Sequence, residues 1–176
     1  MEEQYIELNK KCYDTLAKEY DDTNNANDFG KQLAQELNNA LEEYTKKENY
    51  RVLELGCGTG HVLAGFMELP NSEKYKLYGI ELSENMVKYA KKNCPQAIIA
   101  NKNILDIDDI FTVFNEKDKF DIIIMAAFIH LFPRKDAEIL LKKVKEWLNP
   151  DGLIYIDTTV ESDDYEGVQQ KSKVGI

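Results

Sequence analysis

Cysteine, proline, histidine and tryptophan are all scarce in this sequence. Its 176 residues include three cysteines, four prolines, two histidines and one tryptophan. Cys12, Cys57 and Cys94 form no Cys-x-x-Cys pair and no zinc-ligand spacing, so we expect reduced thiols and no metal site. No segment approaches the roughly 18 consecutive apolar residues of a membrane span, and the acidic first residues do not resemble a secretory signal. We therefore expect a cytoplasmic protein that does not cross a membrane.

Positive charge is also in short supply. The chain has 22 lysines and arginines against 32 aspartates and glutamates, for a net charge of −10. Proteins that bind nucleic acids usually neutralise phosphates with lysine and arginine. The lysine pairs at 46–47 and 91–92 fall late in predicted helices or on polar faces, where solvent or the helix dipole accounts for them. The charge therefore argues against a nucleic-acid partner.

The length fits one domain with a sizeable core, and hydrophobic periodicity predicts alternating helices and strands. Helices are predicted at 4–20, 29–44, 61–69, 83–93 and 134–148, and strands at 51–55, 76–81, 97–100, 120–126 and 153–158. Polar residues 21–25 should separate the first two helices, and 149–152 should form a turn. Strands such as Ile122–Ile124 are continuously apolar, which indicates a parallel sheet covered by helices on both faces. Right-handed crossovers then predict a doubly wound, Rossmann-like α/β fold.

A glycine-rich turn follows the first predicted strand. Gly56, Gly58 and Gly60 alternate there, and Glu81 ends the second apolar strand twenty-one positions after Gly60. A buried strand that enters such a turn, with a carboxylate at the tip of the next strand, is typical of a nucleotide site. Dinucleotide folds require glycine where this chain has His61, which argues against a nicotinamide oxidoreductase. The alternative is a tight turn without a ligand.

The Gly-x-Gly-x-Gly turn, with Glu54 two residues upstream, resembles motif I of the class I S-adenosylmethionine (SAM)-dependent methyltransferases. The other segments that resemble this family follow in order: Tyr13–Asp21, Tyr78–Met86, Asn101–Asp106, Phe120–Asp121 with His130, and Leu148–Gly152. The resemblance covers about Tyr13 to Thr158. It implies the strand order 3-2-1-4-5, SAM as cofactor, S-adenosylhomocysteine as product and a small-molecule acceptor.

The resemblance also assigns residues to the cofactor. The methionine part of SAM would follow the turn that contains Gly56, Cys57, Gly58 and Gly60. Glu54 would lie beneath it, where it fixes loop amides, contacts the amino group through water or is purely structural. The two oxygens of Glu81 can accept both ribose hydroxyls. The adenine would contact Leu82, Met86, Asn103 and Ile104. The family usually has an aspartate at the position of Asn103. For Leu82, Met86 and Ile104, packing in the hydrophobic core is the alternative.

Three further side chains are candidates at the reacting end of the site. Tyr13 and Tyr20 could cover the sulfonium, but both lie on the apolar stripe of the first helix and could simply pack there. Methyl transfer requires a base only if the acceptor arrives protonated. His130, past the end of the fourth strand, is then the candidate, with a structural position at a helix start as the alternative.

The C-terminal end departs from the family pattern, in which the sheet order is 3-2-1-4-5-7-6. After the fifth predicted strand the sequence predicts no further strand, so we expect either a piece of a longer protein or a minimal domain. The expected organisation is a helical lid at 1–27, a SAM-binding domain at 28–160 and an acidic tail at 161–176, the start of a truncated region. An exposed fifth strand carrying Ile154 and Ile156 would invite homodimer formation.

The leading functional hypothesis is a small-molecule methyltransferase. The alternatives are a SAM-binding protein without turnover and a methyltransferase acting on protein, RNA or DNA. Residues 125–128 read Met-Ala-Ala-Phe, which matches neither the Asp/Asn-Pro-Pro-Tyr/Phe of amino-methylating DNA enzymes nor the Pro-Cys of cytosine-C5 enzymes. The sequence does not identify the acceptor.

Overall fold

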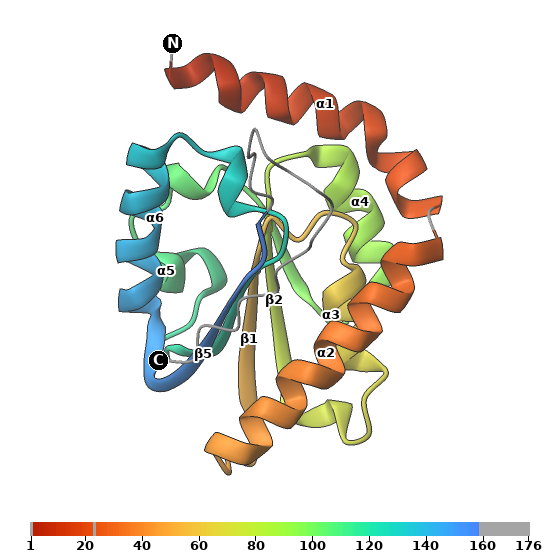
Figure 1. The fold of residues 1–176 in the computed structure, drawn as a ribbon, viewed down its shortest axis with the longest axis vertical. Helices are drawn as coiled ribbons and strands as arrows, with labels where there is room; N and C mark the ends of the chain where they lie inside the picture. Colours follow the sequence, from red (N-terminus) through yellow and green to blue (C-terminus); the bar gives the residue numbers. More distant parts are fainter. Residues whose placement is uncertain (1, 23, 159–176) are drawn as a thin grey trace, which may run out of the picture.

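The computed structural model describes residues 2–22 and 24–158 and contains one parallel sheet (Figure 1). Its strands are β1 Tyr50–Leu55, β2 Tyr75–Glu81, β3 Ile98–Asn101, β4 Phe120–Met125 and β5 Leu148–Ile156. Their spatial order is β3-β2-β1-β4-β5, and each neighbouring pair is parallel. The predicted doubly wound α/β fold and its strand order are therefore confirmed.

Helices cover both faces of this sheet. They are α1 Glu2–Asp22, α2 Asn24–Tyr44, α3 His61–Met67, α4 Glu84–Asn93, α5 Ile110–Phe114 and α6 Arg134–Trp147, with short 3-10 turns η1 Ser72–Lys74, η2 Ile104–Asp106 and η3 Ile129–Leu131. Figure 1 shows α5 and α6 on one side of the strands, α2 and α3 on the other, and α1 across one end. The sequence analysis missed α5, because five residues are too few to show a helical period.

The two faces of the sheet have separate hydrophobic cores. Val52 of β1 packs into the core beneath α2, α3 and α4, whereas the next residue, Leu53, packs into the core beneath α5 and α6. Ile122 and Ile123 of β4 divide in the same way. Side chains of a strand alternate between faces, so a strand buried on both faces must be apolar throughout. This explains the continuous apolar runs in the sequence.

Two glycines let α2 and α3 touch at the backbone. A Cβ atom added to Gly30 would overlap the carbonyl oxygen of His61, and one added to Gly65 would overlap the carbonyl oxygen of Gly30. The N-terminal half of α2 is therefore joined tightly to the helix that follows the glycine-rich turn. The division of the chain between residues 27 and 28 stays a prediction.

The connections differ from the sequence-based prediction in two places. The predicted break at 21–25 is shorter, since α1 continues to Asp22 and α2 begins at Asn24. The predicted turn at 149–152 lies inside β5 as a bulge, because Phe120 pairs with Leu148 and Ile122 with Leu153. The bulge forms where Asp121 Oδ1 accepts hydrogen bonds from Asn149 Nδ2 (2.9 Å) and Lys47 Nζ (2.7 Å). The strand therefore starts at Leu148 and not at Leu153.

Within the described residues, β5 is an edge of the sheet. Ile156 is 41% exposed there, and Ile154 is half-buried. The predicted acidic tail at 161–176 lies outside the described residues. Among those that are described, no helix has the length and apolar character needed to cross a membrane.

Candidate functional site

A cavity of about 240 Å³ opens at the carboxyl ends of β1, β2 and β4, beneath α1. Parallel α/β sheets bind ligands at this end of their strands. The cavity brings together ten of the thirteen predicted site residues: Tyr13, Tyr20, Gly56, Gly58, Glu81, Leu82, Met86, Asn103, Ile104 and His130. The other three, Glu54, Cys57 and Gly60, are buried and do not line it.

Gly58 and Gly60 serve different purposes in the turn. Both have positive φ angles, 52° and 82°, which favour glycine. A Cβ atom added to Gly58 would meet only a ring carbon of Tyr20, at 3.9 Å, so its backbone is open to the cavity. A Cβ atom added to Gly60 would lie 3.1 Å from Cα of Ala90 in α4. Gly58 thus exposes its backbone to the cavity, whereas Gly60 allows the start of α3 to pack against α4.

Glu81 connects the end of β2 to the turn. Its Oε2 accepts the backbone N–H of Gly58 at 3.0 Å, and its Oε1 accepts the backbone N–H of Ser83 at 2.8 Å. Burial raises the pKa of this carboxyl, although the amides of Ser83 and Gly58 act in the opposite direction. Each carboxylate oxygen has two lone pairs. The two amides therefore fix the side chain and leave it able to accept hydrogen bonds from a ligand.

Glu54 lies behind the turn and not in the cavity. It is only 3% exposed, and its Oε2 has no hydrogen-bond partner. Burial, together with the nearby charge of Glu81, raises the pKa of Glu54 well above its ordinary value, while the backbone N–H of Leu63 lowers it. The geometry therefore favours a protonated Glu54 that supports the turn from below.

The wall on the β2–β3 side is mainly apolar. Met86 and Ile104 are 1% and 3% exposed, so they belong to the core as well as to the cavity lining. Asn103 Oδ1 accepts the backbone N–H of Leu105 at 3.2 Å, which starts the turn η2. Asn103 and Leu82 both line the cavity.

Helix α1 forms the roof of the cavity, and Asp14 attaches it to the start of α4. The Asp14 carboxylate accepts the Ser83 hydroxyl at 2.5 Å and the Asn85 backbone N–H at 3.2 Å. Asn85 Nδ2 also donates to the Asp14 carbonyl at 3.0 Å. Burial acts to raise the pKa of Asp14, but the hydrogen bonds from Ser83, Asn85 and Lys10, together with the Lys10 charge, outweigh it and the pKa is lowered. Because Ser83 also donates to Glu81, the roof and the Glu81 carboxylate share one hydrogen-bonded chain.

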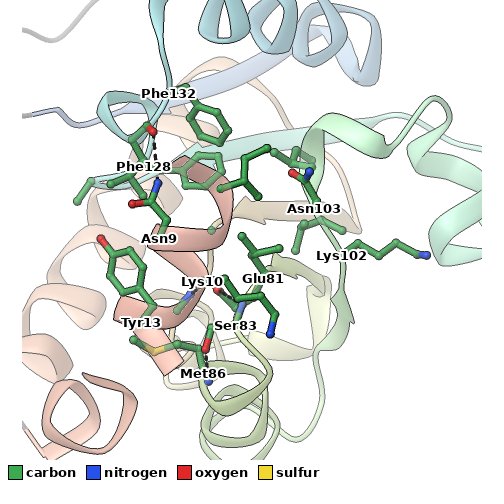
Figure 2. A pocket seen from close by; sticks show the side chains of 18 of the residues that line it. Asn9, Lys10, Tyr13, Glu81, Ser83, Met86, Lys102, Asn103, Phe128 and Phe132 are labelled. Atoms are coloured by element: carbon green, nitrogen blue, oxygen red, sulfur yellow. Dashed lines mark hydrogen bonds between the residues drawn. The ribbon is translucent and has the colours of Figure 1, made fainter. Parts of the chain in front are cut away.

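The opposite wall contains residues that the sequence analysis missed, notably Tyr5, Asn9, Phe128 and Phe132. Figure 2 shows the last three of these. Asn9 Nδ2 donates to the carbonyl of Leu131 at 3.5 Å, which joins α1 to the segment after β4. Tyr5, Asn9 and Tyr13 are spaced four residues apart, so a common helix face was a usable signal. The segment 128–132 has no periodicity to reveal it. His130 is exposed there, at the cavity margin.

The described residues show no group of three or more histidine, cysteine, aspartate or glutamate side chains that could hold a metal ion. Cys57 and Cys94 are buried free thiols, and Cys12 is an exposed one. Burial raises the pKa of both Cys57 and Cys94, so their thiols stay protonated at neutral pH.

Known proteins resemble this chain over much of its length but are longer. It is 28% identical over 117 residues to an (S)-coclaurine N-methyltransferase of Papaver somniferum, covering 66% of this chain and 32% of that protein. It is 29% identical over 153 residues to a malonyl-[acyl-carrier protein] O-methyltransferase of Bacillus cytotoxicus, covering 86% and 49%. The chain therefore spans about a third to a half of the length of these relatives.

Solved structures share the fold. The plantazolicin methyltransferase BpumL, in complex with a pentazolic desmethylPZN analog and SAH, aligns with a TM-score of 0.62 at 18% identity, covering 88% of this chain and 60% of that one. A DhpI–SAM–HEP complex aligns with a TM-score of 0.59 at 20% identity, covering 85% and 63%. The family model described as "Methyltransferase domain" matches residues 46–174, more than half of the sequence. This chain belongs to that methyltransferase domain family.

Proposed function

We propose that this chain binds SAM in the cavity under α1 and supplies the cofactor site of a methyltransferase that acts on a small molecule. The observation that carries the proposal is the hydrogen bond from the Gly58 backbone to the Glu81 carboxylate. It places an exposed glycine backbone and a carboxylate with spare acceptor capacity side by side on one wall of the cavity. Membership of the methyltransferase family supplies the type of reaction.

The residues present fit SAM in three parts. Gly58 offers close backbone approach to the methionine part, since only a ring carbon of Tyr20, at 3.9 Å, lies near the place of a Cβ atom, whereas the Phe128 ring covers that place at Gly56. Glu81 would accept the ribose hydroxyls. The adenine would lie against Leu82, Met86 and Ile104, with Asn103 at its edge.

Bound SAM supplies a methyl group that is activated by a positively charged sulfonium. When the methyl group is transferred, the rest of the cofactor leaves readily as S-adenosylhomocysteine. The chain contributes mainly alignment and exclusion of water, the two contributions that such a displacement needs from a protein. Tyr13 and Tyr20 of the roof line the cavity, and burial raises the pKa of both hydroxyls, so they stay neutral. His130 is the proposed base for an acceptor that arrives protonated.

We further propose residues 1–27 as a lid and 28–160 as the SAM-binding domain, in a cytoplasmic protein that binds no nucleic acid. The exposed edge of β5 could pair with a second copy of the chain. Size-exclusion chromatography with light scattering would test that pairing, because an Ile156→Lys variant should be monomeric if the edge forms a dimer.

Titration calorimetry with SAM, S-adenosylhomocysteine and NAD tests the proposed cofactor. We expect both SAM and its product to bind and NAD to bind more weakly. Tighter binding of NAD would refute the assignment.

The second candidate is a SAM-binding protein without turnover. SAM binding without methyl transfer to any acceptor tested would support this second function.

A further inference from the structure

One wall of the cavity takes no part in the proposed cofactor contacts, and this inference rests on that assignment. It contains three aromatic rings, Tyr5, Phe128 and Phe132, which we call the aromatic wall. The rings of Phe128 and Phe132 meet edge to face with centroids 4.9 Å apart and planes at 74°. Tyr5 and Phe132 meet in the same manner at 6.4 Å and 78°. The three rings therefore form a continuous row from the glycine-rich turn to α1.

Both ends of the aromatic wall are fixed. At one end the Tyr5 hydroxyl donates to Asp136 Oδ2 in the first turn of α6 at 2.8 Å. At the other end the Phe128 ring lies directly on Gly56, where any Cβ atom would overlap it. Gly56 thus makes room for an aromatic ring next to the proposed methionine part of SAM. A wall held at both ends loses little freedom when it binds a ligand.

The aromatic wall itself contains no charged side chain. Lys10 lines the same cavity, but its Nζ is paired with Asp14 Oδ2 at 3.3 Å. Glu81 is the only carboxylate among the described residues that line the cavity, and the proposed function assigns its remaining acceptor capacity to the ribose. A charged group of either sign, buried against the aromatic wall without an oppositely charged partner, is costly. An uncharged aromatic ligand meets no such penalty.

We propose that the aromatic wall binds the methyl acceptor and that this acceptor is a planar aromatic molecule without a formal charge. Its ring would extend the row of edge-to-face contacts at Phe132, and its nucleophile would point toward the glycine-rich turn. The fit follows from ring geometry and charge, and it adds an acceptor class to the proposed methyltransferase.

The first experiment compares three probes that differ in one property each. Calorimetry on the 176-residue chain saturated with S-adenosylhomocysteine measures the binding of 2-naphthol, of decahydro-2-naphthol and of 2-(aminomethyl)naphthalene. We expect 2-naphthol to bind about 3- to 10-fold more tightly than its saturated counterpart, the range that one aromatic pair contributes. We expect the ammonium probe to bind more weakly than 2-naphthol. Absence of binding, equal binding of the two alcohols, or preference for the ammonium probe overturns the proposal.

The second experiment locates the effect. Phe132→Leu and Tyr5→Leu keep apolar volume but remove a ring of the wall, so each should bring the aromatic-to-saturated affinity ratio toward one. Phe111→Leu is the matched control, because Phe111 stacks on Phe120 at 6.2 Å and does not line the cavity. An unchanged ratio in both wall variants, or an equal loss in the control, contradicts the inference. Failure of S-adenosylhomocysteine itself to bind would instead refute the proposed function, and it is measured before any acceptor probe is added.

Discussion

Gly58→Ala should mainly weaken SAM binding, whereas Gly60→Ala should mainly destabilise the fold. The two positions are two residues apart, both with positive φ, at 52° and 82°. A methyl group at Gly58 points into the cavity, where Tyr20 lies 3.9 Å away. A methyl group at Gly60 comes within 3.1 Å of Cα and 3.2 Å of Cβ of Ala90. The same chemical change thus tests the ligand contact at one site and helix packing at the other.

The expected free energies follow from these distances. A non-glycine residue in the left-handed region costs about 1–2 kcal/mol, and this applies to both variants. Overpacking against the Ala90 backbone adds about 1–3 kcal/mol for Gly60→Ala only. We therefore expect Gly58→Ala to lose about 1–2 kcal/mol of unfolding free energy and Gly60→Ala about 2–5 kcal/mol. SAM affinity should fall by about tenfold or more in Gly58→Ala, which is about 1.4 kcal/mol or more.

Urea denaturation followed by circular dichroism measures the two unfolding free energies, and calorimetry at a temperature where both variants are folded measures SAM binding. Gly58→Val should abolish detectable binding while the helices and strands persist. If Gly58→Ala binds SAM as tightly as the unaltered chain, the ligand does not lie on this turn. Equal destabilisation by the two alanines would refute the different purposes assigned to the two glycines.

Three other predictions address the carboxylates around the cavity. Glu81→Ala should weaken SAM binding by about 1.5–3 kcal/mol, the range for hydrogen bonds to a charged group, and unchanged affinity in a folded variant would remove Glu81 from the site. Burial raises the folded-state pKa of Glu54 above the ordinary value of 4.5. The protonated Glu54 side chain therefore contributes fully to the unfolding free energy below pH 4.5, and this contribution is lost as the pH rises through the folded-state pKa. The unfolding free energy of Glu54→Gln relative to the unaltered chain should therefore increase as pH rises above 4.5 toward neutrality, and a difference independent of pH contradicts this. Asp14→Ala removes the acceptor of Ser83, so amide hydrogen exchange in α1 should accelerate at least about fivefold while β4 keeps its protection. Equal exchange in the two chains would show that Asp14 does not hold the roof.

Local pattern was sufficient for most of the fold and part of the site. The continuous apolar runs predicted buried parallel strands, because a strand with a core on each face has no polar side. Glu81 was predicted at the strand tip and a helix from residue 83, and Ser83 Oγ does accept the Met86 N–H at 3.1 Å as the cap of α4. These features depend on residues within a few positions of one another, so the sequence displays them directly.

The opposite wall of the cavity depends on contacts that no local pattern contains. Tyr5 meets Asp136 across 131 positions of sequence, and Asn9 meets Leu131 across 122. Gly58 and Gly60 look alike in the sequence, yet an added Cβ atom would meet Ala90 only at Gly60, whereas the backbone of Gly58 is open to the cavity. These contacts depend on the position of α1 over the carboxyl end of the sheet and on the packing of α4 against the glycine-rich turn. The sequence determines which strands and turns form, but the side chains that share a cavity are chosen by how the two helical layers pack around the sheet, because that packing brings distant segments within contact distance.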